Sequence, residues 1–148
     1  MLVVIPLGCL LWWPNVTYYN IGAWRHLGWP LAIAGIWIYG WSAVDFVKAK
    51  SGVPNFFRTP EGLVATGPYR LVRNPMYVGC LAVFAAEALL LPTSTTIAWG
   101  VQNLAVLLAW VRFKEEPSLR KHFGARYLAY CAQVPRWLPR LSPPVLRR

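Results

Sequence analysis

A polar, basic and turn-rich segment, residues 67–79, runs directly into a long apolar stretch. The side chains in this segment that could bind a ligand or take part in a reaction are Tyr69, Arg70, Arg73, Asn74 and Tyr77. The next apolar stretch ends in a second charged group, made of Arg112, Glu115 and Glu116. An arginine can bind a carboxylate through two parallel hydrogen bonds, a carboxylate can bind an ammonium or a hydroxyl, and a tyrosine ring attracts cations. If both apolar stretches cross a membrane, the two groups lie on one side of it and can form a single site.

Composition indicates a membrane protein of one domain, residues 1–148. Hydrophobic residues make up 57% of the 148, and nine are Trp, which is too apolar for an ordinary soluble domain. The three cysteines are far apart and no histidine lies near them at metal-ligand spacing. The pattern therefore favours neither a bound metal nor a disulfide framework.

The apolar stretches predict an all-α integral membrane protein with about four transmembrane helices and a C-terminal amphipathic helix. A span needs about 20 apolar residues, and the first stretch is short for a full crossing. The predicted helices are 1–13, 27–47, 75–91, 95–113 and, for the amphipathic helix, 117–131. In the last of these, apolar and aromatic residues recur every three or four positions. This helix either lies on the membrane surface or folds back over residues 67–77 as a lid.

Basic residues lie almost entirely on one side of this arrangement. Apart from Arg25, every Lys and Arg falls in the loop 48–74 or beyond residue 111. The positive-inside rule assigns that side to the cytoplasm. The net charge of +10 then reflects topology and contact with anionic lipid. We therefore expect membrane lipids as partners, and no nucleic acid. The short chain and its brief loops are interpreted as those of a bacterial or archaeal inner-membrane protein.

Three motifs occur in a fixed order, separated by the predicted hairpin. They are Gly67-Pro68-Tyr69-Arg70-x-x-Arg73-Asn74-Pro75-Met76-Tyr77-x-Gly79, Glu115-Glu116-x-x-Leu119-x-x-x-Phe123-Gly124-x-x-Tyr127-x-x-Tyr130 and Val134-Pro135-Arg136-Trp137-Leu138-Pro139. The ordered set, within residues 60–140, resembles the isoprenylcysteine carboxyl methyltransferase family. These are integral-membrane enzymes that depend on S-adenosylmethionine and that also resemble phospholipid N-methyltransferases.

The resemblance implies an S-adenosylmethionine site formed by residues 61–77 and 112–137. The cofactor-binding residues it implies are Leu63, Val64, Tyr69, Asn74, Pro75, Met76, Tyr77, Glu115 and Glu116. Side-chain chemistry, apart from the resemblance, gives the candidate catalytic residues: Arg73, with Arg70 as an alternative, as a clamp for a carboxylate, and Arg112 as a holder of an anionic acceptor. Where the family commonly has His, this chain has Asn74, which keeps a donor and an acceptor but does not titrate near neutral pH. We expect Asn74 to bind the cofactor rather than act as a base.

The function expected from this resemblance is methyl transfer to a lipophilic small-molecule or lipidated acceptor at the cytoplasmic membrane face. The acceptor group that the resemblance favours is a carboxylate of the isoprenylcysteine type. Methyl transfer to a lipid amine or a small thiol is an alternative. A non-catalytic membrane protein that retains the fold is another.

Overall fold

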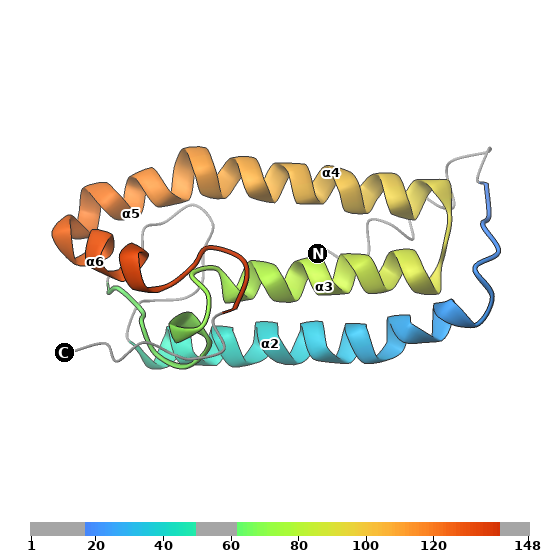
Figure 1. Ribbon diagram of the computed structural model, residues 1–148, viewed down its shortest axis with the longest axis horizontal. Coiled ribbons are helices and arrows are strands. Elements are labelled where there is room, and N and C mark those ends of the chain that lie inside the picture. The colour runs from blue at the N-terminus through green and yellow to red at the C-terminus, as the bar shows by residue number, and fades with distance from the viewer. Residues whose placement is uncertain (1–16, 50–61, 140–148) are drawn as a thin grey trace.

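The structure, a computed structural model, describes residues 17–49 and 62–139 (Figure 1). Within these residues all regular elements are helices and none is a β-strand, which confirms the all-helical prediction for this part of the chain. The elements are η1 (Gly22–Leu27), α2 (Gly28–Lys48), η2 (Gly67–Arg70), α3 (Pro75–Leu90), α4 (Ser94–Trp110), η3 (Val111–Glu115), α5 (Glu116–Phe123) and α6 (Ala125–Gln133). The predicted helix 1–13 lies outside the described residues.

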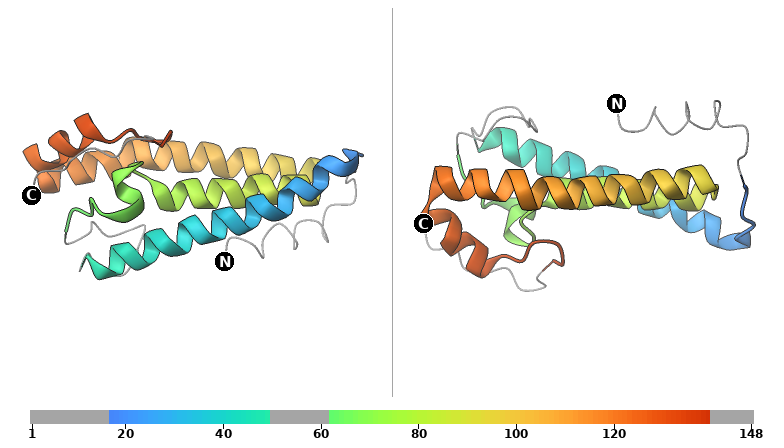
Figure 2. Two further views of the ribbon diagram at one scale, coloured as in Figure 1. Left: turned by 60° about the horizontal axis from the view of Figure 1, so that its bottom comes forward. Right: turned by 90° about the horizontal axis from the view of Figure 1, so that it is seen from above.

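Helices α2 and α3 lie side by side and antiparallel because glycines allow their backbones to touch (Figures 1 and 2). A Cβ atom added to Gly79 would lie 2.7 Å from the carbonyl oxygen of Gly35. A Cβ added to Gly35 would lie 2.8 Å from the carbonyl oxygen of Gly79. Further along, Gly28 packs just as closely against α3 near Ala86 and Leu90. Small residues that permit such approach are the usual basis of helix packing in membranes.

The turn between α3 and α4 is fixed by hydrogen bonds at its own residues and to the segment before η1. The Thr93 side chain accepts from the Thr96 backbone N–H at 3.1 Å, and the Thr93 N–H donates to Thr96 Oγ1 at 3.2 Å. This reciprocal capping box satisfies N–H groups that a helix start leaves unpaired. The Tyr19 N–H donates to the Pro92 carbonyl at 2.8 Å, which ties the preceding segment to the same turn.

The structure differs from the prediction at the end of α4. We expected one helix to end at residue 113 and another to begin at 117, but the chain stays helical from Ser94 to Phe123. Pro117 cannot donate a backbone hydrogen bond and its ring crowds the carbonyl four residues earlier. The π-helical turn η3, Val111–Glu115, widens the helix just before this proline. The helix ends instead at Gly124, whose φ of +53° and ψ of −128° suit only glycine.

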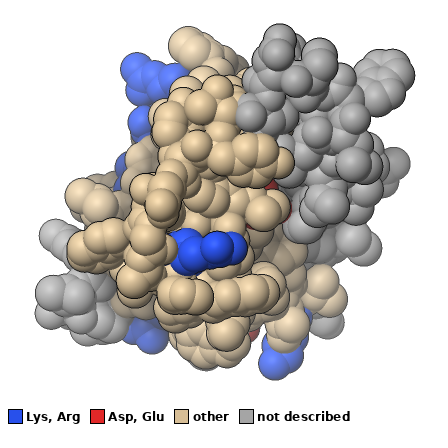
Figure 3. All heavy atoms as spheres, turned by 90° about the vertical axis from the view of Figure 1, so that its right-hand side faces the viewer, with Lys and Arg blue, Asp and Glu red and all other residues tan. Residues whose placement is uncertain are grey.

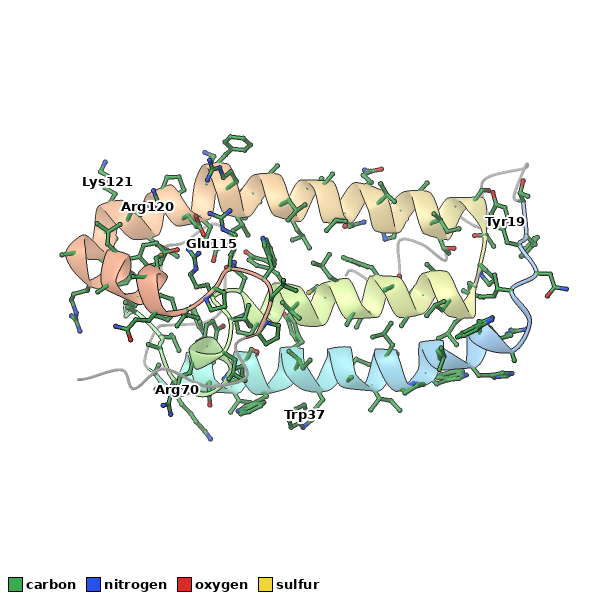
Figure 4. All side chains as sticks on the ribbon, viewed as in Figure 1. Tyr19, Trp37, Arg70, Glu115, Arg120 and Lys121 are labelled. Atoms are coloured by element: carbon green, nitrogen blue, oxygen red, sulfur yellow. The ribbon has the colours of Figure 1, made fainter. Side chains whose placement is uncertain are left out.

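Two helices of the described chain are long and apolar enough to cross a membrane, Gly22–Lys48 and Ser94–Phe123. The 16-residue α3 is a shorter apolar helix. Large apolar side chains cover the outer faces; Trp37, for example, points away from α3 (Figure 4) and is 63% exposed. Such an outward apolar surface suits contact with lipid. Of the four crossings predicted, the first lies outside the described residues.

The two ends of the helices differ in charge. Figure 3 views the end that carries η1 and the α3–α4 turn, and the described part of its surface is mainly uncharged. Arg25 belongs to this end, where it lies in η1. The opposite end carries the other described basic residues, which are Lys48, Arg70, Arg73, Arg112, Lys114, Arg120, Lys121, Arg126 and Arg136. We call this opposite end the basic end.

Candidate functional site

Three segments that are distant in sequence meet at the basic end (Figures 1 and 2). They are residues 67–77, the η3–α5 region, and α6 with the residues that follow it. Helix α6 turns back from α5 at Gly124 and lies over the first segment, which it contacts through the hydrogen bond from Tyr130 to the Tyr69 carbonyl. Of the two expectations for the amphipathic region, α6 therefore follows the one in which it folds back over residues 67–77; its role as a lid stays a prediction.

The first segment reaches α3 through a tight glycine turn. Gly67 has a φ of +48°, which strains any residue with a Cβ, and an added Cβ would also collide with Oδ2 of Asp45. The 3₁₀ turn η2 follows and buries Tyr69, whose ring lies 6.4 Å from that of Phe46. Pro75 then begins α3, where its missing N–H costs nothing. The turn thus fixes Tyr69 between α2 and the remainder of the site.

A hydrogen bond joins the two halves of the sequence motif. The Tyr77 hydroxyl, on the first turn of α3, donates to Oε2 of Glu115 at 2.6 Å. Helix side chains lean toward their own N-terminus, so these two lean toward each other across antiparallel helices. Glu115 points inward from its helix, whereas Lys121 points outward (Figure 4).

The neighbouring Glu116 is buried and bound by arginines. Its side chain is 4% exposed. Arg136 reaches both carboxylate oxygens, with Nε 2.8 Å from Oε1 and Nη2 2.6 Å from Oε2. Arg73 Nη1 donates to Oε1 at 3.0 Å, and the exposed Arg120 lies 3.9 Å from Oε2. The hydrogen bond from Arg136 to Glu116 raises the pKa of Arg136, so the guanidinium stays charged.

Residues 134–137, here called the C-terminal strap, pass over the start of α3. The Arg73 N–H donates to the Pro135 carbonyl at 2.9 Å, and Asn74 Nδ2 donates to the Arg136 carbonyl at 3.3 Å. Just before the strap, the Tyr130 hydroxyl donates to the Tyr69 carbonyl at 2.7 Å. Burial raises the pKa of Tyr130, which keeps the hydroxyl protonated as a donor. The strap and α6 therefore fix the backbone of residues 69–74.

The predicted cofactor residues lie in different surroundings. Most gather at the basic end, where Tyr69, Asn74, Pro75 and Tyr77 are buried and Met76 is half-buried. Leu63 packs against the apolar cluster of Tyr127, Tyr130 and Val134, and Val64 is buried nearby in the chain.

The two predicted catalytic arginines differ sharply. Arg112 is exposed, in the π turn η3. Arg73 is largely buried, and its Nε has no hydrogen-bond partner among the described residues, although its Nη1 binds Glu116 and Cys131 Sγ. Buried N–H groups in proteins almost always have a hydrogen-bond acceptor, so a bound ligand could supply one here.

Sequence reasoning missed three residues that organise this end. Arg136 was recognised only as part of a motif, yet it is the principal partner of Glu116. Tyr130 was likewise named only as part of a motif, yet its hydroxyl binds the Tyr69 carbonyl. Asp45, an acid near the end of a predicted span, lies against Gly67. Its position was a usable signal, because acids within predicted membrane spans are often functional.

The chain belongs to the phospholipid methyltransferase family, whose model matches residues 24–126, well over half of its length. The match runs from η1 to the start of α6, so it includes the Tyr77–Glu115 contact and ends before the strap. It confirms the relation to phospholipid methyltransferases expected from the motifs. No curated protein and no solved structure matches the chain.

Proposed function

We propose that this protein transfers a methyl group from S-adenosylmethionine to a lipophilic acceptor at the cytoplasmic face of a membrane. The observation that carries the proposal is the Tyr77–Glu115 hydrogen bond, which brings the two polar halves of the motif together within a chain of the phospholipid methyltransferase family. The basic end would face the cytoplasm by the positive-inside rule. A bacterial or archaeal inner membrane is the expected location.

The donors and acceptors at the basic end fit S-adenosylmethionine. Glu115 can bind the cofactor's ammonium or a ribose hydroxyl while it keeps its bond from Tyr77. The Arg73 Nε that has no partner among the described residues can donate to the cofactor's carboxylate. Tyr69 and Met76 offer aromatic and thioether surfaces to the adenine and the sulfonium. When bound, the cofactor supplies a methyl group made electrophilic by the positive sulfur.

The protein's own contribution to such a reaction is positioning. Methyl transfer is an in-line displacement, so the site must align the acceptor atom with the methyl carbon and exclude water. Arg73, Asn74 and Tyr77 are held by bonds to Glu116, the strap and Glu115, which limits their freedom before any ligand binds. Preorganisation of this kind lowers the entropy cost of reaching the reactive geometry.

For the acceptor, a carboxylate of the isoprenylcysteine type remains the first candidate by resemblance. Arg112 would hold that carboxylate, since it is exposed at the end of a lipid-spanning candidate helix. Arg73 is less available for it, because its Nη1 already serves Glu116. A carboxylate nucleophile needs no base, which agrees with the absence of a titrating group at Asn74.

A specific observation favours a lipid amine as the second candidate. The buried Tyr69 is influenced by two carboxylates: its pKa is raised mainly by burial, and further by the negative charges of Glu115 and Asp45. Two acids beside a buried aromatic ring attract a cationic ammonium and repel an anionic acceptor. Under this alternative Asp45 would bind the amine headgroup.

Calorimetric binding of S-adenosylmethionine and S-adenosylhomocysteine to protein in detergent and in nanodiscs tests the proposal. We expect micromolar binding that Glu115→Gln weakens by about 1.5–3 kcal/mol, the range for a charged hydrogen bond. Folded wild-type protein that binds neither compound in either medium would contradict the proposal and favour a non-catalytic role.

Methylation assays with a farnesylcysteine derivative and with phosphatidylethanolamine then separate the acceptors. Asp45→Asn should lower transfer to the amine and leave transfer to the carboxylate unchanged. Arg112→Gln should lower transfer to the carboxylate and leave transfer to the amine unchanged. A small thiol serves as a third acceptor in the same assay.

A further inference from the structure

Glu116 is the most completely bound charge in the described part of the protein. Arg73 and Arg136 together engage both oxygens of its carboxylate, and the side chain is almost inaccessible to solvent. Moving a carboxylate out of water is costly unless its hydrogen bonds are replaced, and here two guanidinium groups replace them. Because both oxygens are engaged and the side chain is almost inaccessible, Glu116 is poorly placed to bind a ligand directly.

The two arginines that hydrogen-bond Glu116 come from two different segments, the one that leads into α3 and the strap that passes over it. Arg73 precedes Asn74 and α3, while Arg136 lies within the strap itself. Two further bonds connect the same segments, from the Arg73 N–H to the Pro135 carbonyl and from Asn74 Nδ2 to the Arg136 carbonyl. Glu116 thus lies at the junction of three elements, one of which carries its neighbour Glu115.

We propose that Glu116 is a positioning residue, which holds the C-terminal strap on residues 73–74 and so keeps Asn74, Tyr77 and Glu115 in the geometry that binds the cofactor. This inference rests on the proposed function for its effect on the cofactor, though not for its effect on the strap. It assigns different roles to the two adjacent acids: Glu115 contacts the cofactor, and Glu116 acts through Arg73 and Arg136.

Hydrogen–deuterium exchange tests the strap without any cofactor. The backbone N–H of Arg73 is bonded to Pro135, so its exchange reports directly on the docked strap. In Glu116→Gln we expect this amide to exchange about tenfold faster or more, while the amides of α2 exchange as in the wild type. Arg120→Gln is the matched control, because Arg120 is an exposed partner of the same carboxylate at 3.9 Å. The control should leave the Arg73 amide unchanged.

Cofactor affinity and turnover test the positioning role. Glu116→Gln should raise the dissociation constant and KM for S-adenosylmethionine roughly fivefold or more, the usual size of coupling between linked sites. The kcat at saturating cofactor should change less than KM. Glu116→Asp should recover part of the affinity, since it restores the charge.

Arg136→Gln provides a second variant in case Glu116→Gln does not fold. It releases the strap from Glu116 but leaves the Arg73–Glu116 pair, so we expect the same direction of change in both measurements. Folded variants that keep wild-type exchange at Arg73 and wild-type cofactor affinity would overturn the inference. Wild-type protein without cofactor binding would overturn the proposed function instead, and the exchange experiment would still decide whether Glu116 holds the strap.

Discussion

Glu115 and Glu116 are adjacent in the chain, yet their carboxylates bind entirely different partners. Glu115 accepts from the Tyr77 hydroxyl of α3, whereas Glu116 binds Arg73 and Arg136. Successive residues of a helix point about 100° apart, so one acid faces α3 and the other faces the strap. The pair can therefore combine a ligand contact with a structural ion pair at a single point of the helix.

Tyr77→Phe should weaken binding of S-adenosylmethionine less than Glu115→Gln does. The substitution removes one hydrogen bond to the carboxylate but leaves the charge in place, and we expect a loss of about 0.5–1.5 kcal/mol in binding free energy. The effects of the two substitutions should not add in the double variant, because both act on one interaction. Calorimetry measures all three variants, and Tyr19→Phe, at the opposite end, is the control (Figure 4). Full additivity would indicate that Tyr77 acts independently of Glu115.

Gly79→Ala should destabilise the protein. The new Cβ would lie 2.7 Å from the Gly35 carbonyl oxygen and 2.9 Å from the Tyr39 nitrogen, both backbone atoms that cannot move alone. Overpacking of this kind costs about 1–3 kcal/mol. Unfolding in mixed micelles of increasing dodecyl sulfate content measures the change.

Gly40→Ala is the matched control for the same helix pair. A Cβ at this position meets nothing within 4 Å, so the alanine should leave stability unchanged or raise it by up to about 1 kcal/mol. Equal effects of the two substitutions would show that α2 and α3 do not pack through Gly79.

Tyr130→Phe should lower stability by about 1–3 kcal/mol, because it leaves the carbonyl of the buried Tyr69 without its donor. Burial raises the pKa of Tyr130 in the folded protein above its unfolded value. The unfolded chain therefore loses this proton first, and the stabilisation is complete below about pH 10 and declines above it. Unfolding measured from pH 7 to 11 should show a constant difference between wild type and variant below pH 10, and a smaller one above it. A difference that grows with pH would contradict this assignment.

Cysteine labelling should place the basic end in the cytoplasm. In a variant without native cysteines, a cysteine at Arg126 should react with an impermeant reagent only after the membrane is opened. A cysteine at Asn20, near the α3–α4 turn, should react in intact cells. The reverse pattern would place the proposed site on the outer face.

The sequence predicts the helices more closely than it predicts the site. Hydropathy and Pro92 place α3 and the start of α4 within one residue of their observed bounds. The sequence wrongly predicted a break between residues 113 and 117. A proline is common at a helix start, so Pro117 did not reveal that the helix continues through it after a π turn. The partners of Glu116 were missed because they are 20 and 43 residues away, and only the folded chain brings them together. By contrast, the motif itself identified Tyr77 and Glu115.

Because the helix from Ser94 to Phe123 is unbroken, it should not tolerate the insertion of single residues. Its start is fixed by the Thr93 cap, so the count of residues from there sets both the height and the direction of Glu115. One inserted residue would turn every later side chain by about 100° and shift it by about 1.5 Å, which exceeds what the 2.6 Å bond from Tyr77 tolerates. Insertions of single residues in α4 should therefore abolish the alignment of the acids, although they lie in an apolar region remote from any polar group of the site.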